Sequence, residues 1–240
     1  MTNDKIVIFH CPFVIFMPPA LLIDFDGTIV PYDIEFELLA RFGGSDKAED
    51  VVARWERGEL TVPERLTAGF SALRGGGVTR NQLEDFLDGV PIDPSFSDFL
   101  QFLQSRNWPH AILSDGLVWY IEGVLRRHKI ENVPPIIANE IDFEAGWRLT
   151  FPHRNGDCSP CRQCAACKRY PVRDAKAWAD PVILITDGRA DRWAAAECDI
   201  VFAKEPLFSI LRRWEKPKRL FAFESFEDVT REMENAMRNP

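Results

Sequence analysis

The stretch ALLIDFDGT, residues 20–28, decides the fold of this 240-residue chain. Its apolar first half predicts a short buried strand, and Asp26-Gly27-Thr28 predicts the turn that ends it. Side chains two residues apart in an extended segment point the same way, so Asp24 and Asp26 face one side. One carboxylate can then act as a nucleophile while the other transfers a proton, and Gly27 lets the backbone approach a phosphate closely.

Strand and helix patterns alternate along the rest of the chain. Short apolar runs predict further strands at 110–113, 136–139, 182–185 and 200–203, with a hairpin over 140–151. Helical spacing predicts helices over 96–103, 117–127, 172–178, 191–197 and 226–237. The sequence therefore predicts an α/β fold: a doubly wound parallel sheet over 20–32 and 90–240, with a small all-helical cap at 33–89 inserted after the first strand.

Acidic side chains follow several of the predicted strands. The strand ends are followed by Asp24 and Asp26, by Ser114-Asp115, and by Asp187 with Asp191 one helical turn later. In such a sheet these ends meet at one crevice. A single Asp at a strand end is usually a helix cap, but so many carboxylates together repel one another unless a cation binds. Because oxygen ligands suit Mg²⁺, the sequence predicts a magnesium site at this edge.

Composition narrows the expected partners and compartment. The apolar fraction of 46% supports a large core, and the net charge of −8 disfavours binding to nucleic acid or an anionic membrane surface. The apolar run within residues 1–19 is too short to span a membrane and lacks the cationic start of a signal peptide, so we interpret it as a leader, with Met17 as a candidate start. The cysteine usage indicates a reducing compartment, and we expect a cytoplasmic protein of unspecified oligomeric state.

Four stretches resemble the haloacid dehalogenase superfamily: DFDGTI at 24–29, ILSDG at 112–116, Lys168, and ITDGRAD at 185–191. Their order and spacing frame nearly the whole chain after residue 19. The chain is most similar to the branch with a small helical cap. That branch contains phosphoserine phosphatases, the 2-hydroxy-3-keto-5-methylthiopentenyl-1-phosphate phosphatases of methionine salvage, and phosphoethanolamine/phosphocholine phosphatases. The resemblance implies a Mg²⁺-dependent phosphatase that hydrolyses a small phosphomonoester through an aspartyl phosphate.

The resemblance also implies a role for each matching residue. Asp24 would attack phosphorus, and Asp26 would protonate the leaving alcohol and then activate water. Lys168 would neutralise charge on Asp24 and on the phosphoryl group. Substrate contacts would come from Ser114, Gly116 and Thr28. The ligands of Mg²⁺ would be Asp24, Asp26, Asp187 and Asp191.

Two positions depart from the family pattern. Thr186 stands where the fourth motif usually has Gly, and Asp115 follows Ser114 where Gly is more common. Thr186 is equally well explained as a strand residue, and Asp115 as a helix N-cap. A functional alternative gives Asp115 and Glu35, at the entrance of the cap, the recognition of a substrate ammonium group. The rival substrate is an uncharged keto-sugar-like phosphate.

The segment CSPCRQCAACK contains four regularly spaced cysteines, Cys158, Cys161, Cys164 and Cys167. Four thiolates could hold a structural Zn²⁺, although zinc sites usually pair two separated CxxC knuckles. Reduced thiols or a disulfide are the alternatives. The cysteines would also support a non-enzymatic metal-binding module, and the same fold would support a phosphoserine phosphatase or a phosphomutase.

Overall fold

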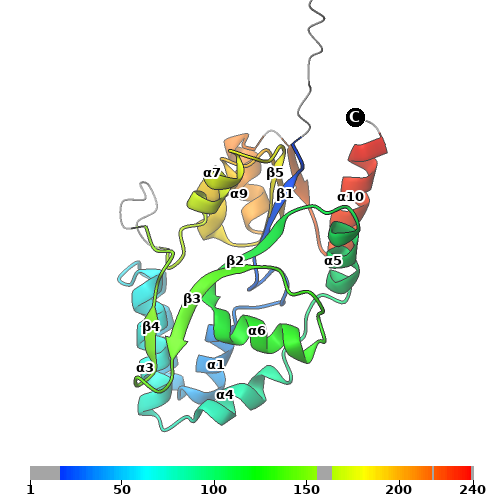
Figure 1. Ribbon diagram of the computed structural model, residues 1–240. Helices are drawn as coiled ribbons and strands as arrows, with labels where there is room; N and C mark the ends of the chain where they lie inside the picture. Colours follow the sequence, from blue (N-terminus) through cyan, green and yellow to red (C-terminus); the bar gives the residue numbers. More distant parts are fainter. Residues whose placement is uncertain (1–16, 156–163, 218, 239–240) are drawn as a thin grey trace, which may run out of the picture.

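The computed structural model describes residues 17–155, 164–217 and 219–238, and its centre is one mostly parallel β-sheet (Figure 1). The strand order is β4-β3-β2-β1-β5-β6-β7. The strands are β1 Ala20–Ile23, β2 His110–Leu117, β3 Ile136–Asp142, β4 Arg148–Thr150, β5 Val182–Thr186, β6 Ile200–Ala203 and β7 Arg219–Ala222. Neighbours are parallel except for β4, which is antiparallel to β3. The predicted parallel sheet and the predicted hairpin over 140–151 are therefore confirmed.

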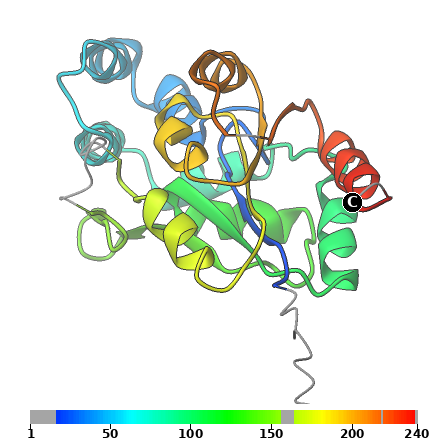
Figure 2. The same cartoon turned by 90° about the horizontal axis from the view of Figure 1, so that it is seen from above.

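Side chains of β1 alternate between two hydrophobic cores, because successive residues of a strand point to opposite faces. The helices that cover the two faces are α5 Phe96–Ser105, α6 Val118–Arg127, α7 Arg169–Ala175, α8 Arg192–Ala195 (after the 3₁₀ turn η1 Arg189–Asp191), α9 Leu207–Trp214 and α10 Phe226–Arg238. Leu21 and Ile23 join the core that includes α5, α6 and α10, whereas Ala20 and Leu22 join the core that includes α7, α8 and α9. Figure 2 shows α5 and α10 side by side next to the sheet. Burial on both faces explains why the inner strands are continuous apolar runs.

Four helices between β1 and α5 form the cap. They are α1 Ile34–Phe42, α2 Ser45–Glu56, α3 Val62–Gly75 and α4 Arg80–Leu87. Asp33 caps α1 with its side chain, and Thr61 and Thr79 each begin a capping box, so polar residues in the sequence determine where three of these helices start. The predicted helical insertion is confirmed, while its division from the core at 33 and 89 stays a prediction.

The β3–β4 hairpin contacts the cap as well as the core. Arg74 of α3 donates a hydrogen bond from Nη1 to the carbonyl oxygen of Gly146 at 2.9 Å. The ring of Trp147 lies 6.5 Å from that of Phe70 in α3 and 5.3 Å from that of Phe143 in the hairpin turn. These contacts hold α3 against the hairpin.

Two elements near the carboxyl terminus, α9 and β7, were not predicted. The edge strand β7 has a short apolar run, Leu220 to Ala222, with exposed or half-buried side chains. So short a run does not by itself distinguish a strand from another kind of segment. Within its 8 residues α9 buries only Leu207 and Leu211, a pattern too short for helical spacing to stand out. The strand β2 also runs beyond the predicted 110–113, through an irregular register between Leu113 and Leu117.

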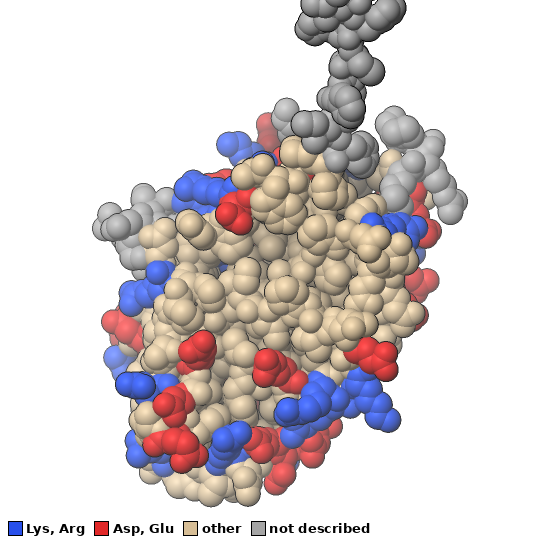
Figure 3. Space-filling view, in the orientation of Figure 1, with Lys and Arg blue, Asp and Glu red and all other residues tan. Residues whose placement is uncertain are grey.

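On the face shown in Figure 3, Lys and Arg lie next to Asp and Glu in the lower part and along the edges, and the middle of the face is largely without charged side chains. The expected absence of a nucleic-acid partner stays a prediction. In the part of the chain that the structure describes, no helix is long and apolar enough to cross a membrane. Residues 1–16 of the predicted leader, and the cysteines Cys158 and Cys161, lie outside the described residues.

We expect Phe99→Ala to lower the free energy of unfolding by about 3–5 kcal/mol, because it leaves a cavity in a packed core. Phe99 is 1% exposed, and its ring lies 5.0 Å from that of Phe226, so it joins α5 to α10. Tyr170→Ala is the control, since Tyr170 is 67% exposed and its removal should change stability by less than about 0.5 kcal/mol. Urea denaturation measures both, and equal losses would contradict the packing described here.

Candidate active site

The carboxyl ends of β1, β2 and β5 meet at one cavity of about 360 Å³. Most of the site residues expected from the sequence line it. They are Asp24, Asp26, Ser114, Asp115, Gly116, Lys168, Asp187 and Asp191. Thr28 and Glu35 do not line the cavity, so their contact with substrate stays a prediction.

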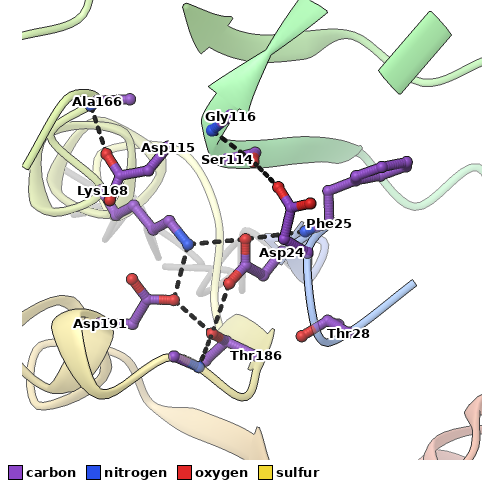
Figure 4. Close-up of polar contacts among 12 residues, drawn as sticks. Asp24, Phe25, Thr28, Ser114, Asp115, Gly116, Ala166, Lys168, Thr186 and Asp191 are labelled. Carbon is purple, nitrogen blue, oxygen red and sulfur yellow. Dashed lines mark hydrogen bonds and ion pairs between the residues drawn. The ribbon is translucent and has the colours of Figure 1, made fainter. Parts of the chain in front are cut away.

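A closed ring of polar contacts surrounds the carboxylate of Asp24, which is 5% exposed (Figure 4). Lys168 Nζ lies 2.8 Å from Asp24 Oδ1 and 2.7 Å from Asp191 Oδ2. The hydroxyl of Thr186 contacts the same Asp191 oxygen and lies 3.1 Å from Asp24 Oδ2, which closes the ring. The backbone N–H of Phe25 donates to Asp24 Oδ1 at 2.8 Å. Both oxygens of Asp24 therefore have fixed partners.

Thr186 takes part in the site and is more than a strand residue. It is fully buried at the end of β5, and its hydroxyl oxygen accepts the N–H of Gly188 at 3.2 Å. Its single hydroxyl proton serves two carboxylates, those of Asp24 and Asp191. A glycine at this position would leave the Asp24 oxygen without that donor.

The electrostatics of this ring leave an excess of negative charge. Burial raises the pKa of Asp24 well above its usual value, Lys168 opposes that rise, and Asp191 and Asp187 add to it. Burial alone would lower the pKa of Lys168, but Asp191 and Asp24 outweigh burial and hold it above the usual value. One buried ammonium group thus interacts with four carboxylates, those of Asp24, Asp115, Asp187 and Asp191, and a further cation would offset their repulsion.

This donor set fits Mg²⁺. The carboxyl groups of Asp191 and Asp24 both approach Gly188, since a Cβ built there would lie 3.2 Å and 3.6 Å from their Oδ2 atoms. Asp187 lies over Gly27, where a built Cβ would be 2.1 Å from its Oδ2. Within the described ranges, no group of three or more His, Cys, Asp or Glu side chains is arranged so that it could hold a metal ion by itself. Mg²⁺ needs no such cage, because it usually takes one or two carboxylates and completes its shell with waters and phosphate.

Asp26 has its own partners on the other side of the cavity. Its Oδ1 accepts the N–H of Ile34 at 3.0 Å, and its Oδ2 accepts the hydroxyl of Tyr120 at 2.8 Å. The hydroxyl of Ser114 lies 3.4 Å from the same Oδ2. Burial and repulsion from Asp33 raise the pKa of Asp26 to about 7. A carboxyl group with that pKa can both give and take a proton near neutral pH.

Asp115 holds the segment that carries Lys168. Its Oδ1 accepts the N–H of Ala166 at 2.6 Å, and the Asn139 amide donates to the Asp115 carbonyl oxygen at 2.6 Å. Burial raises the pKa of Asp115, and Lys168 opposes that rise. The carboxylate that the sequence assigned to a helix cap or to substrate therefore joins β2 to the residues just before Lys168.

The cap closes the cavity with an arginine and with apolar side chains. Arg65 is 6% exposed, and its Nη1 lies 2.7 Å from a carboxylate oxygen of Glu35. The guanidinium carbon lies 5.4 Å from the ring centre of Trp55, which lines the cavity with Tyr32 and Val62. Burial raises the pKa of Glu35 to about 8 although Arg65 opposes that rise. Glu35 is thus a buried partner of Arg65 and does not itself line the cavity.

Several site residues carried no signal in the sequence. Tyr120 and Arg65 belong to no motif and reach the cavity from the sides of α6 and α3. Lys204, which follows β6, lies 3.3 Å and 3.2 Å from the carbonyl oxygens of Gly27 and Thr28 and holds that turn. Thr28 in turn donates to Asp187 at 3.0 Å, so its observed contact is with an expected metal ligand.

Zinc binding by the four cysteines, one of the alternatives that the sequence leaves open, has no support from the described residues. Cys164 is half-buried and Cys167 is 2% exposed, but the other two cysteines lie outside the described residues. Cys167 donates its backbone N–H to the carbonyl of His153 at 2.9 Å, which fixes the chain immediately before Lys168.

Residues 21–196 match the family described as haloacid dehalogenase-like hydrolases. A protein of an Exiguobacterium species named 2-hydroxy-3-keto-5-methylthiopentenyl-1-phosphate phosphatase is 28% identical over 220 residues, which cover 89% of this chain and 96% of that protein. A Bacillus cereus protein of the same name is 27% identical over 216 residues, covering 88% of this chain and 93% of its own.

Solved structures show the same fold. A phospho-aspartyl intermediate analogue of phosphoserine phosphatase superposes with a TM-score of 0.64 at 15% identity, covering 90% of this chain and 98% of that chain. A HAD family hydrolase from Salmonella enterica serovar Typhi superposes with a TM-score of 0.65 at 17% identity, covering 89% of this chain and 71% of its own.

We expect Gly27→Ala to weaken Mg²⁺ binding, because the added Cβ would occupy the place of the Asp187 carboxylate. Gly44→Ala is a matched control. Gly27 and Gly44 have φ values of +74° and +75°, so alanine is strained at both, but no atom lies within 4 Å of a Cβ built at Gly44. Isothermal titration with MgCl₂ measures the affinity. Equal affinities for the two variants would show that Asp187 does not hold the metal.

Proposed function

The chain belongs to the haloacid dehalogenase-like hydrolases and is a phosphoric monoester hydrolase; we propose that it is a Mg²⁺-dependent phosphatase that forms an aspartyl phosphate on Asp24. The observation that carries this proposal is the ring around Asp24. In it Lys168 Nζ lies 2.8 Å from Asp24 Oδ1, at the cavity that Asp26 and Ser114 also line. A nucleophile, a proton-transfer group and a cation thus meet where a phosphate could enter.

The first step is attack on phosphorus by a carboxylate oxygen of Asp24. A bond from phosphorus to Asp24 forms as the bond to the leaving oxygen breaks, and Asp26 gives its proton to that oxygen. Ser114 donates a hydrogen bond to a phosphoryl oxygen, and Lys168 offsets the negative charge of Asp24 and of the phosphoryl group. The pKa of Asp26, raised to about 7 by burial and Asp33, suits this transfer.

In the second step Asp26, now ionised, takes a proton from water, and the hydroxide that results attacks the aspartyl phosphate. Asp24 leaves as a carboxylate and inorganic phosphate is released. The candidate holders of Mg²⁺ are Asp24, Asp187 and the carbonyl of Asp26, with Asp191 in support. When bound, Mg²⁺ supplies positive charge that stabilises the phosphoryl oxygens.

We further propose a substrate with no charged group besides its phosphate and with an apolar tail, of the class of 2-hydroxy-3-keto-5-methylthiopentenyl-1-phosphate. The relatives that carry that name align over most of this chain. The cap side of the cavity is lined by Tyr32, Trp55 and Val62, which offer aromatic and aliphatic surface to a thioether. Sulfur contacts with aromatic rings are favourable by about 0.3–1.5 kcal/mol.

Recognition of a substrate ammonium group has less support. Asp115 already accepts the N–H of Ala166 at 2.6 Å, and Glu35 is buried against Arg65 at 2.7 Å. Glu35 also does not line the cavity. Both carboxylates suggested by the sequence therefore already have partners within the protein.

We expect Asp24→Asn to lower kcat by about 10³-fold or more, since an amide is a poor nucleophile. Its melting temperature should match or exceed that of the wild type, because the change removes a buried charge that Asp191 and Asp187 repel. Asp85→Asn, on the exposed side of α4, is the control and should change neither value. Phosphate release from an aryl phosphate with MgCl₂ measures kcat; retention of most activity by Asp24→Asn would rule out the mechanism.

For the substrate, we expect a higher kcat/KM for an alkyl phosphate that ends in a methylthio group and has no ammonium group than for phosphoethanolamine. Trp55→Ala should lower kcat/KM for the methylthio substrate about 10-fold and leave that for propyl phosphate unchanged, because only the longer substrate reaches the ring. Trp178→Ala is the control, since Trp178 is similarly exposed, 44% against 38%, and lies away from the cavity. A preference for phosphoethanolamine would reverse the substrate assignment.

A further inference from the structure

We propose that Tyr120 is a positioning residue that fixes the carboxyl group of Asp26 for proton transfer to the leaving oxygen. This inference rests on the proposed function and extends it to a residue outside every motif. Tyr120 lies in α6, six positions after Ser114, and is 1% exposed. Its hydroxyl donates to Asp26 Oδ2 at 2.8 Å.

The side chain of Tyr120 is itself held in place. Its ring lies 6.2 Å from that of Phe25, the residue between the two aspartates, and 6.3 Å from that of Trp119. The tyrosine therefore cannot follow Asp26 if the carboxyl group turns away, because its ring is packed in the main core. A fixed donor of this kind limits the carboxyl group to one orientation.

Gly116 shows that the chain makes room for this contact. A Cβ built on Gly116 would lie 1.7 Å from the Tyr120 hydroxyl oxygen and 2.8 Å from Asp26 Oδ2. Any side chain at this position would expel the hydroxyl. Gly116, for which a substrate contact stays a prediction, thus also leaves space for the hydrogen bond between Tyr120 and Asp26.

Asp26 is held from the opposite side as well. The N–H of Ile34, the first residue of α1 in the cap, donates to Asp26 Oδ1 at 3.0 Å. One oxygen of Asp26 is thus held by the cap and the other by α6 of the core. The proton that Asp26 gives to the leaving oxygen comes from its own carboxyl group, and Tyr120 keeps its hydroxyl proton throughout.

The test compares two substrates of similar size whose leaving groups differ. Benzyl phosphate needs a proton donor for its alkoxide, whereas 4-nitrophenyl phosphate releases a stable phenolate without one. We expect Tyr120→Phe to lower kcat/KM for benzyl phosphate about 10- to 100-fold and for 4-nitrophenyl phosphate less than about 3-fold. Gly116→Ala should change the ratio in the same direction, because its methyl group displaces the Tyr120 hydroxyl.

Ile121→Val controls for packing, since Ile121 is fully buried in the same helix, does not line the cavity and has a side chain that cannot form hydrogen bonds. It should lower both values of kcat/KM by the same factor, if at all. Equal losses for the two substrates in Tyr120→Phe and Gly116→Ala would overturn the inference and leave the proposed function intact. If the wild type hydrolyses neither phosphate, the proposed function itself fails.

Discussion

The ion pair between Lys168 and the carboxylates of Asp24 and Asp191 is the interaction on which the rest of the site depends. All three groups are 4–6% exposed, and a lone charge at such a depth would be strongly destabilising. Asp24 directly follows β1, Lys168 directly precedes α7, and Asp191 lies in the turn after β5. They meet only when the sheet has formed, so the catalytic arrangement and the folded core are one cooperative structure. The surplus of negative charge that remains is what makes the site receptive to a divalent cation and, through it, to phosphate.

The sequence predicted the parts of the site that follow from strand geometry. A buried strand ending in two aspartates, repeated by Ser114 and Asp187 at other strand ends, leaves few choices for where the carboxylates meet. The fold class followed from the same alternation of strands and helices. The edge strand β7 was missed although residues 220–222 are apolar, because so short a run does not show whether its backbone pairs with a neighbouring strand.

Residues that reach the cavity sideways could not be predicted. The contact of Tyr120 with Asp26 depends on the angle at which α6 leaves β2, and the position of Arg65 depends on how α3 packs over the cavity. Asp115 shows a different limit of local spacing. The sequence placed it correctly beside Ser114 but could not show that the N–H of Ala166 would occupy its carboxylate. Local spacing identifies which groups are near, whereas tertiary packing decides which of them are already paired.

The central position of β1 has a consequence for motion. Its amide groups lie in the fourth of seven strands and between two hydrophobic cores, so their hydrogens should exchange with solvent only when the whole domain opens. Asp24 follows directly on this strand. Asp26, two residues later, shares its oxygens between α1 and α6, and α1 belongs to the cap. The two aspartates are neighbours in sequence, but Asp26 accepts a hydrogen bond from the cap, whereas the partners described for Asp24 lie in the core. Opening of the cap would therefore change the surroundings of the proposed proton-transfer group, Asp26, before those of the proposed nucleophile, Asp24.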